Sequence, residues 1–305
     1  MPALRTVIED VRPSAPQSSL RRPSSVRLAA DAGRRVLETT GAADRIDLVI
    51  NVGVYRDGHI CEPALAPLIQ RRIASLAQRK DVFSLDLMNG GCGLVNALQV
   101  VDTFVRTGSV RRALVVASDV DPDPRRSSGL AVRPAGVAIV AGAVEGPEGF
   151  LAFHSETFTE YAGLYEGRVD WLGPRGWLTG GAGHAVAVRT DESYTDRCAA
   201  CAAASATRFL AAQGLAIGDI DLVVAPDSPC SFAGAFSAML QLDRRCVIGG
   251  PASAGAHSAA PGLALSAAMA SGRLRAARRT LLVAAGAGIT VALALYGGQD
   301  PTRGA

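Results

Sequence analysis

A cysteine lies in a glycine-rich turn of the kind that can present a nucleophile. The turn is Asn89-Gly90-Gly91-Cys92-Gly93, and it follows an apolar run at residues 82–87 that predicts a buried strand. An apolar helix follows the turn, and residues 113–120 predict a second buried strand. Glycines let the backbone bend sharply, and the start of a helix supplies unpaired N–H groups that favour a thiolate. The sequence therefore offers Cys92 as a candidate nucleophile.

The other cysteines and the histidines form no pattern typical of a metal or redox site. Cys198 and Cys201 have a CxxC spacing, but they lie in an alanine-rich helical run without a second CxxC or a histidine pair. Packing within a helix is the better interpretation, and we expect no metal and no cofactor. His59 and His184 lie beside glycines in segments typical of surface loops. Cys230 could face a pocket or pack in the core.

Composition limits the class of protein. Of 305 residues, 49% are hydrophobic and 19% are charged, which is typical of a globular chain with a sizeable core. The net charge of +3 is too small to indicate nucleic-acid binding, and no uncharged apolar run is long enough to cross a membrane. The N-terminus has no signal-peptide pattern, so we expect a cytoplasmic protein with reduced cysteines. Arginine doublets such as Arg111-Arg112 are typical of solvated surface, or could dock an acidic carrier.

The apolar periodicity predicts alternating strands and helices. Strands are expected at residues 3–9, 46–54, 82–87, 113–120, 133–144, 220–225, 245–250, 280–284 and 289–296. Helices are expected at 25–40, 63–77, from Gly93 through Asp102, and at 195–214, 232–242 and 258–271. Residues 149–177, rich in glycine and aromatic side chains, are expected to cover a cavity. The segment IDLVI at Ile46 recurs as IDLVV at Ile220, which indicates a duplicated α/β fold.

Four segments in order resemble ketoacyl-ACP synthase III enzymes of the thiolase superfamily. They are LDLMNGGCGLVNALQVVD at Leu85, IDLVVAPDSPCSFAGA at Ile220, GGPASAGAHSAAPGLALSAAMASGRL at Gly249 and LLVAAGAGITVALALY at Leu281. The resemblance implies a thiolase-like duplicated αβαβα layered fold. It also implies an N-terminal half at residues 1–145, bearing the nucleophile turn, and a C-terminal half at 146–305.

The family's catalytic residues do not carry over directly. Its nucleophile falls at Gly91, one position before Cys92, and one step at a helix start turns a side chain by about 100°. Its histidine falls at Asp227, and an ionised carboxylate donates no hydrogen bond. The position of its asparagine depends on how the segments are aligned. Matching the SAA segment places it at Ala256, and counting from Asp227 places it at His257. The glycines that would form the backbone of an oxyanion hole remain. They are Gly91 and Gly93 in the turn and Gly286 and Gly288 in the C-terminal loop.

Two hypotheses follow from these departures. In the first, the chain is a catalytically degenerate subunit that pairs with a catalytic ketosynthase paralogue, as in heterodimeric condensing systems. In the alternative, it is an acyltransferase or condensing enzyme with Cys92 as nucleophile, His257 as base and Asp227 orienting that base. Cys92 could also be simple core packing, and His257 a helix cap. A binding role without acyl chemistry is a third possibility.

The resemblance also implies partners. Acyl-CoA or an acyl carrier protein would deliver the acyl group. The edge strand near residues 82–87 would join two subunits, either two copies of this chain or this chain and the paralogue.

Overall fold

The structure is a computed structural model that describes residues 4–16, 22–174, 182–243, 246–249 and 253–298. This part of the chain forms two five-stranded sheets and a two-stranded hairpin. No helix in these residues is long and apolar enough to cross a membrane.

The first sheet has its parallel strands at one side. Its spatial order is β1 (Leu4–Pro13), β5 (Ala135–Glu145), β4 (Arg112–Asp119), β2 (Leu48–Asn51) and β3 (Phe83–Asp86). β2 pairs in parallel with β3 and β4, so the carboxyl ends of these three strands meet at one edge of the sheet. β3 is the outermost of these strands.

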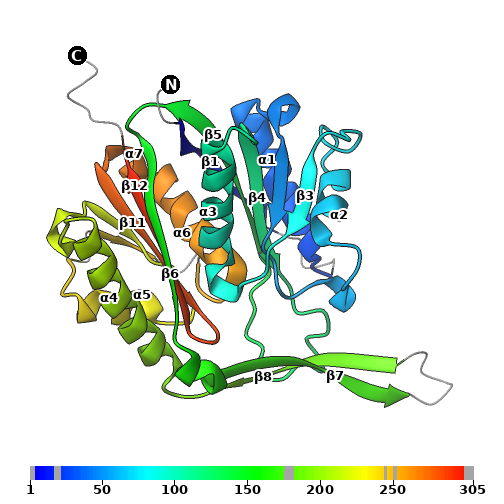
Figure 1. Cartoon of the computed structure of the whole chain (residues 1–305). Coiled ribbons are helices and arrows are strands. Elements are labelled where there is room, and N and C mark those ends of the chain that lie inside the picture. The colour runs from blue at the N-terminus through cyan, green and yellow to red at the C-terminus, as the bar shows by residue number, and fades with distance from the viewer. Residues whose placement is uncertain (1–3, 17–21, 175–181, 244–245, 250–252, 299–305) are drawn as a thin grey trace.

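The second sheet repeats this arrangement. Its order is β10 (Val247–Ile248), β9 (Leu222–Val224), β11 (Arg279–Gly286), β12 (Thr290–Gly297) and β6 (Gly149–Thr157). β9 is parallel to β10 and β11, while β12 is antiparallel to β11 and β6. β2 and β4 of the first sheet thus correspond to β9 and β11 of the second, and the duplication predicted from the sequence is confirmed. The hairpin of β7 (Tyr165–Pro174) and β8 (Ala182–Thr190) extends away from both sheets (Figure 1).

The helices and sheets form five layers (Figure 1). α1 (Ser25–Thr40) and α2 (Leu65–Arg72) cover the outer face of the first sheet. α3 (Gly93–Arg106) and α6 (Ala260–Ala270) lie between the sheets, followed by the short α7 (Arg273–Ala276). α4 (Tyr194–Ala212) and α5 (Phe232–Met239) cover the outer face of the second sheet. This is the thiolase-like αβαβα arrangement that the resemblance implied.

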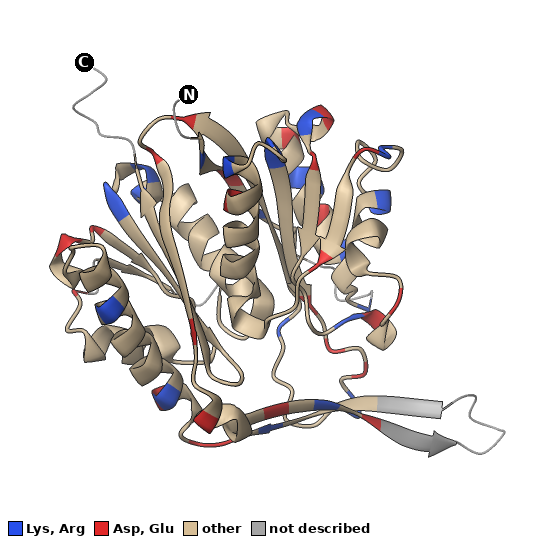
Figure 2. Cartoon of the chain, in the orientation of Figure 1, with Lys and Arg blue, Asp and Glu red and all other residues tan. Residues whose placement is uncertain are grey.

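Burial on both faces explains why the strands read as continuous apolar runs. In β4, Leu114 packs toward α1 while Val115 packs toward the central helices. α6 has the sequence APGLALSAAMA without a charged residue, as expected for a helix enclosed between two sheets. Charged residues are instead spread over the outer helices, the ends of strands and the hairpin (Figure 2).

Most predicted elements are present with differences at their boundaries, but β6, β7 and β8 were not predicted as strands. α1 begins and ends as predicted, because Ser24 caps its start and Gly41 adopts a left-handed conformation (φ 60°) at its end. β1 is longer than residues 3–9, because its pairing with β5 continues past a bulge between Ile8 and Asp10. The helix predicted over 63–77 stops at Arg72. Residues 149–177 form β6, a short turn and β7, and their end at 175–177 lies outside the described residues.

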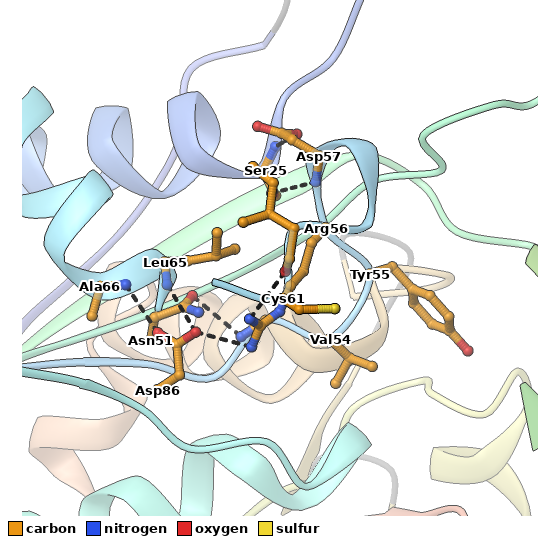
Figure 3. A network of polar contacts seen from close by, with 12 residues as sticks. Ser25, Asn51, Val54, Tyr55, Arg56, Asp57, Cys61, Leu65, Ala66 and Asp86 are labelled. Atoms are coloured by element: carbon orange, nitrogen blue, oxygen red, sulfur yellow. Dashed lines mark hydrogen bonds and ion pairs between the residues drawn. The ribbon is translucent and has the colours of Figure 1, made fainter. Parts of the chain in front are cut away.

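A buried ion pair anchors α2 to the first sheet (Figure 3). Asp86, the last residue of β3, accepts hydrogen bonds from the N–H groups of Leu65 (2.9 Å) and Ala66 (2.9 Å) at the start of α2. The Arg56 guanidinium lies 2.9 Å from the same carboxylate, and both side chains are about nine-tenths buried. The carboxylate therefore acts as a helix cap supplied by a neighbouring strand.

Replacing this carboxylate tests the anchor. Asp86→Ala leaves Arg56 buried without its counter-ion and removes the cap of α2, so we expect the free energy of unfolding to fall by about 3 kcal/mol. Urea unfolding followed by circular dichroism measures the change. Asp81→Ala is the matched control, because its ion pair with Arg79 lies on the surface. Equal midpoints for the two variants would contradict the anchoring role.

Candidate active site

A cavity of about 430 Å³ lies where loops from both halves of the chain meet. Its volume is within the range of small-molecule sites. Its walls come from the loop 129–132, the base of the hairpin, the first turn of α4, the loop 228–230 after β9, and the end of β11. Gly91 and His257 also line it. These are the ends of strands where α/β folds place their ligands.

The glycine turn approaches the end of β11 so closely that no side chain fits at position 91. Residues Gly90–Cys92 form a 3-10 turn that leads into α3. A Cβ atom built on Gly91 would lie 2.6 Å from the carbonyl oxygen of Ala285, and one built on Gly286 would lie 3.1 Å from the Gly91 nitrogen. The turn and the loop of Gly286 are thus in backbone contact. A residue other than glycine at position 91 requires the β11 backbone to move.

Cys92 points into the protein core. Its side chain is fully buried among apolar residues, and its Sγ donates a hydrogen bond to the carbonyl oxygen of Thr290 at 3.1 Å. Burial raises the pKa of this thiol well above its ordinary value, with nearby Cys198 adding to the effect. The thiol is therefore protonated at neutral pH, even though it lies at the start of a helix. Cys92 is not among the described residues that line the cavity.

Asp227 lies next to the cavity but is not among its described lining residues. It is partly buried, and its backbone N–H donates to Ser253 Oγ at 3.0 Å. The residues after it, Ser228 to Cys230, do line the cavity.

His257 is paired with a carboxylate that the sequence analysis did not single out. Its Nδ1 lies 3.3 Å from Oδ2 of Asp119, the last residue of β4, and this carboxylate is completely buried. The partner that orients the imidazole in the structure is thus Asp119, whereas the Cys92 hypothesis assigned this role to Asp227. A polar residue at the carboxyl end of a buried strand is a signal that would have indicated Asp119.

Asp119 is held by hydrogen bonds from two segments. Oδ1 accepts from the N–H groups of Val54 (2.7 Å) and Tyr55 (2.6 Å), after β2. Oδ2 accepts from the N–H group of Ser258 at 2.8 Å and from the Ser258 hydroxyl. Burial on its own would raise the pKa of Asp119, but His257 and these hydrogen bonds outweigh it and hold the pKa below its ordinary value. The carboxylate is therefore charged at neutral pH.

Two tyrosines continue this polar group toward the hairpin. The Tyr55 ring packs against His257 with ring centroids 4.9 Å apart, and its hydroxyl lies 2.7 Å from the hydroxyl of Tyr165 at the start of β7. Burial raises the pKa of both phenols, so both stay protonated. The pair connects the loop after β2 to the hairpin wall of the cavity.

The structure thus brings together some of the predicted site residues and separates others. Gly91, Gly286 and His257 line one cavity. Cys198 and Cys201 are buried in α4. Cys230 is exposed and lines the cavity. The sequence had left open whether it faces a pocket or packs in the core. Among the described residues, no group of three or more His, Cys, Asp or Glu side chains is arranged to hold a metal ion.

Comparison with solved structures defines the class of fold. The chain superposes on 3-oxoacyl-(acyl-carrier-protein) synthase III from Pseudomonas aeruginosa with a TM-score of 0.76 at 21% identity, covering 97% of this chain and 99% of that one. A variant of Xanthomonas campestris OleA with bound lauric acid and lauroyl-CoA gives 0.74 at 16% identity, covering 96% and 99%. The fold is that of the thiolase-like condensing enzymes.

Sequence relatives define the family. The chain is 33% identical over 285 residues to beta-ketoacyl-(acyl-carrier-protein) synthase III of Alkalilimnicola ehrlichii, covering 88% of this chain and 82% of the relative. It is 28% identical over 285 residues to synthase III 2 of Streptomyces coelicolor, covering 90% and 80%. The chain belongs to the beta-ketoacyl-(acyl-carrier-protein) synthase III family. No family model matches the sequence.

The pH dependence of stability tests the charged state of Asp119. A carboxylate whose pKa is lower in the folded state stabilises the fold above its unfolded pKa of about 4, and this contribution is lost as the pH falls through the folded pKa. Asp119→Asn is therefore expected to lower the free energy of unfolding by about 3 kcal/mol at neutral pH, and by less below about pH 4.

Urea unfolding of the wild type and the variant, from about pH 3 to about pH 7, measures this difference. Asp44→Asn is the control, because Asp44 is exposed. The free energy of unfolding of Asp44→Asn should change with pH in the same way as that of the wild type. A constant difference between Asp119→Asn and the wild type across this range would contradict a charged, depressed Asp119.

Proposed function

We propose that this chain is a synthase III-type subunit that binds an acyl thioester in its cavity without catalysing the condensation of its family. The observation that carries the proposal is Gly91. The position where the family places its nucleophile has no side chain here, and the carbonyl of Ala285 occupies the space where one would begin.

The position of Cys92 supports the same conclusion. A nucleophilic cysteine must be ionised and must reach the substrate. This thiol is fully buried, donates a hydrogen bond to the carbonyl oxygen of Thr290 and has a raised pKa. The alternative hypothesis, in which Cys92 accepts the acyl group, requires the turn to open and Cys92 to leave the core.

The donor pair of the family is also incomplete. Condensation needs hydrogen-bond donors for the developing oxyanion or enolate. An ionised Asp227 accepts hydrogen bonds but donates none, and Ala256 has no polar side chain. If the asparagine position is Ala256, the nucleophile and both donors are lost. If it is His257, the nucleophile and the donor at position 227 are lost, and either case supports a binding role rather than a modified condensation.

The cavity suits an acyl chain. Its walls include the apolar side chains of Leu130, Val132 and Val188 and the small residues Ala131 and Ala287. The OleA variant whose fold this chain shares contains lauric acid and lauroyl-CoA. We therefore propose a medium-chain acyl thioester of coenzyme A or of a carrier protein as the ligand.

The edge strand supports pairing with a second subunit. β3 is an outer strand of its sheet, and Phe83 at its start and Met88 after its end are both 58% exposed. An exposed strand edge with apolar side chains is a surface that proteins normally cover. We propose a cysteine-bearing synthase III paralogue as the partner, with a second copy of this chain as the other possible outcome.

Ligand binding tests the cavity. Dodecyl-coenzyme A, a thioether that cannot transfer its chain, should bind saturably in isothermal titration calorimetry. Ala131→Trp should weaken this binding by about tenfold or more, because Ala131 is small and lines the cavity. Ala74→Trp is the matched control, since Ala74 is exposed and lies in a turn after α2.

Catalysis is tested in the same preparation. With lauroyl-CoA and a malonyl-loaded carrier protein, we expect no ketoacyl product above the level without protein. Product that disappears in Cys92→Ala would contradict the proposal and support the Cys92 hypothesis. Failure of dodecyl-coenzyme A to bind at all would contradict the binding role.

Substitution of the edge strand tests pairing. Phe83→Arg places a charge at the exposed edge, and we expect it to weaken association by about tenfold or more in light scattering after size-exclusion chromatography, with and without the co-expressed paralogue. Met239→Arg is the control, because Met239 is a 46% exposed hydrophobic residue in α5, on the second sheet. Unchanged association of Phe83→Arg would contradict pairing through β3.

A further inference from the structure

We propose that Cys230 accepts the acyl group in this cavity by thioester exchange, with His257 as its general base and Asp119 positioning that base. The inference rests on the proposed function, because it requires an acyl thioester in the cavity. It adds a covalent step that uses a different wall of the cavity from the family's nucleophile turn.

Cys230 is the one cysteine among the described residues that line the cavity. It lies in the loop after β9, directly before α5, and it is exposed. Its Sγ lies 3.8 Å from Ser231 Oγ, and the backbone of Ser231 has a positive φ of 67°. Cys92, Cys198 and Cys201, by contrast, are buried. Cys230 therefore has the access to a ligand that Cys92 lacks.

His257 shares the cavity with Cys230 and has the hydrogen-bonding arrangement of a base. With Nδ1–H donating to Asp119, the lone pair of the imidazole is on Nε2, which makes no hydrogen bond with the described residues. The fully buried carboxylate fixes this tautomer and stabilises the imidazolium that forms when Nε2 takes a proton.

The backbone at His257 is held in an unfavourable conformation. Its φ is 46°, which is uncommon for a residue other than glycine, and the Ser258 hydrogen bonds to Asp119 hold the next residue in place. Such conformations lower stability and occur most often at functional sites. The turn thus gives up stability to keep the imidazole against Asp119 at the cavity wall.

The exchange needs no other reactant. The Cys230 thiol gives its proton to His257 Nε2, and the thiolate sulfur attacks the carbonyl carbon of the incoming thioester. The bond between that carbon and the sulfur of coenzyme A or of the carrier then breaks, and the leaving thiolate takes the proton back from His257. The products are an acyl-Cys230 thioester and a free thiol. Without donors for an enolate, the acyl group is held for transfer rather than extended.

Intact-mass spectrometry with peptide mapping tests this step. Incubation of the full chain with lauroyl-CoA should give one lauroyl adduct per chain at Cys230, together with one equivalent of released coenzyme A measured by chromatography. Cys230→Ser should form no thioester adduct and should no longer release coenzyme A. Cys61→Ala is the matched control, because Cys61 is also exposed but is not among the described cavity residues, and it should acylate like the wild type.

The pH dependence of the acylation rate distinguishes a general base at His257 from a histidine with a structural role only. Acylation of the wild type should reach its full rate at a lower pH than acylation of His257→Gln, which should be about 100-fold slower and should need a more alkaline pH. Asp119→Asn should give a similar profile. Equal rates and profiles for the wild type and His257→Gln would overturn the role of the base.

The outcomes distinguish this inference from the proposed function. An adduct on Cys92 overturns both the inference and the binding-only role. Binding of dodecyl-coenzyme A without any adduct or release from lauroyl-CoA overturns the inference alone. Release of coenzyme A that persists in Cys230→Ser also overturns it. Absence of binding overturns both.

Discussion

The site depends on one buried carboxylate. Asp119 ends β4 in the first sheet and accepts hydrogen bonds from the loop after β2 and from the turn at Ser258, which begins the helix between the sheets. A fully buried charge is tolerated only when its oxygens are satisfied, so these segments must stay in place together. The cavity wall formed by His257 is thereby fixed to the end of the first sheet, although the two residues are far apart in the sequence.

Packing alone can account for the conformation of the glycine turn at residues 89–93. Gly91 lies against Ala285, Cys92 fills the core beside Thr290, and α3 starts directly afterwards. The central layer, which contacts both sheets, therefore depends on the course of this turn. Since packing alone accounts for the glycines and the buried thiol, the retained motif is weak evidence for retained chemistry.

The sequence predicted the layers well because buried strands and amphipathic helices leave strong periodic patterns. The limits of α1 were predicted correctly from its apolar spacing, and in the structure Ser24 and Gly41 cap its two ends. The site was harder to predict. A shift of one residue decides whether a thiol at a helix start enters the cavity or the core, and the pairing of Asp119 with His257 joins residues from two loops. Local patterns contain neither piece of information, whereas the general rule that strand ends hold functional polar groups would have indicated Asp119.

The chemistry of this fold can change more easily than its architecture. Most side chains of the inner strands and of α6 are buried, so most substitutions there lower stability. Much of the cavity wall, in contrast, comes from loops at strand ends, including residues 129–132 and 228–230, which are not part of those cores. A nucleophile can therefore be lost from one loop, at Gly91, and a thiol presented from another, at Cys230, with the sheets unchanged. Because the cavity's position is set by the sheets and its side chains by the loops, the fold of the family determines where the cavity lies but not which chemistry it supports.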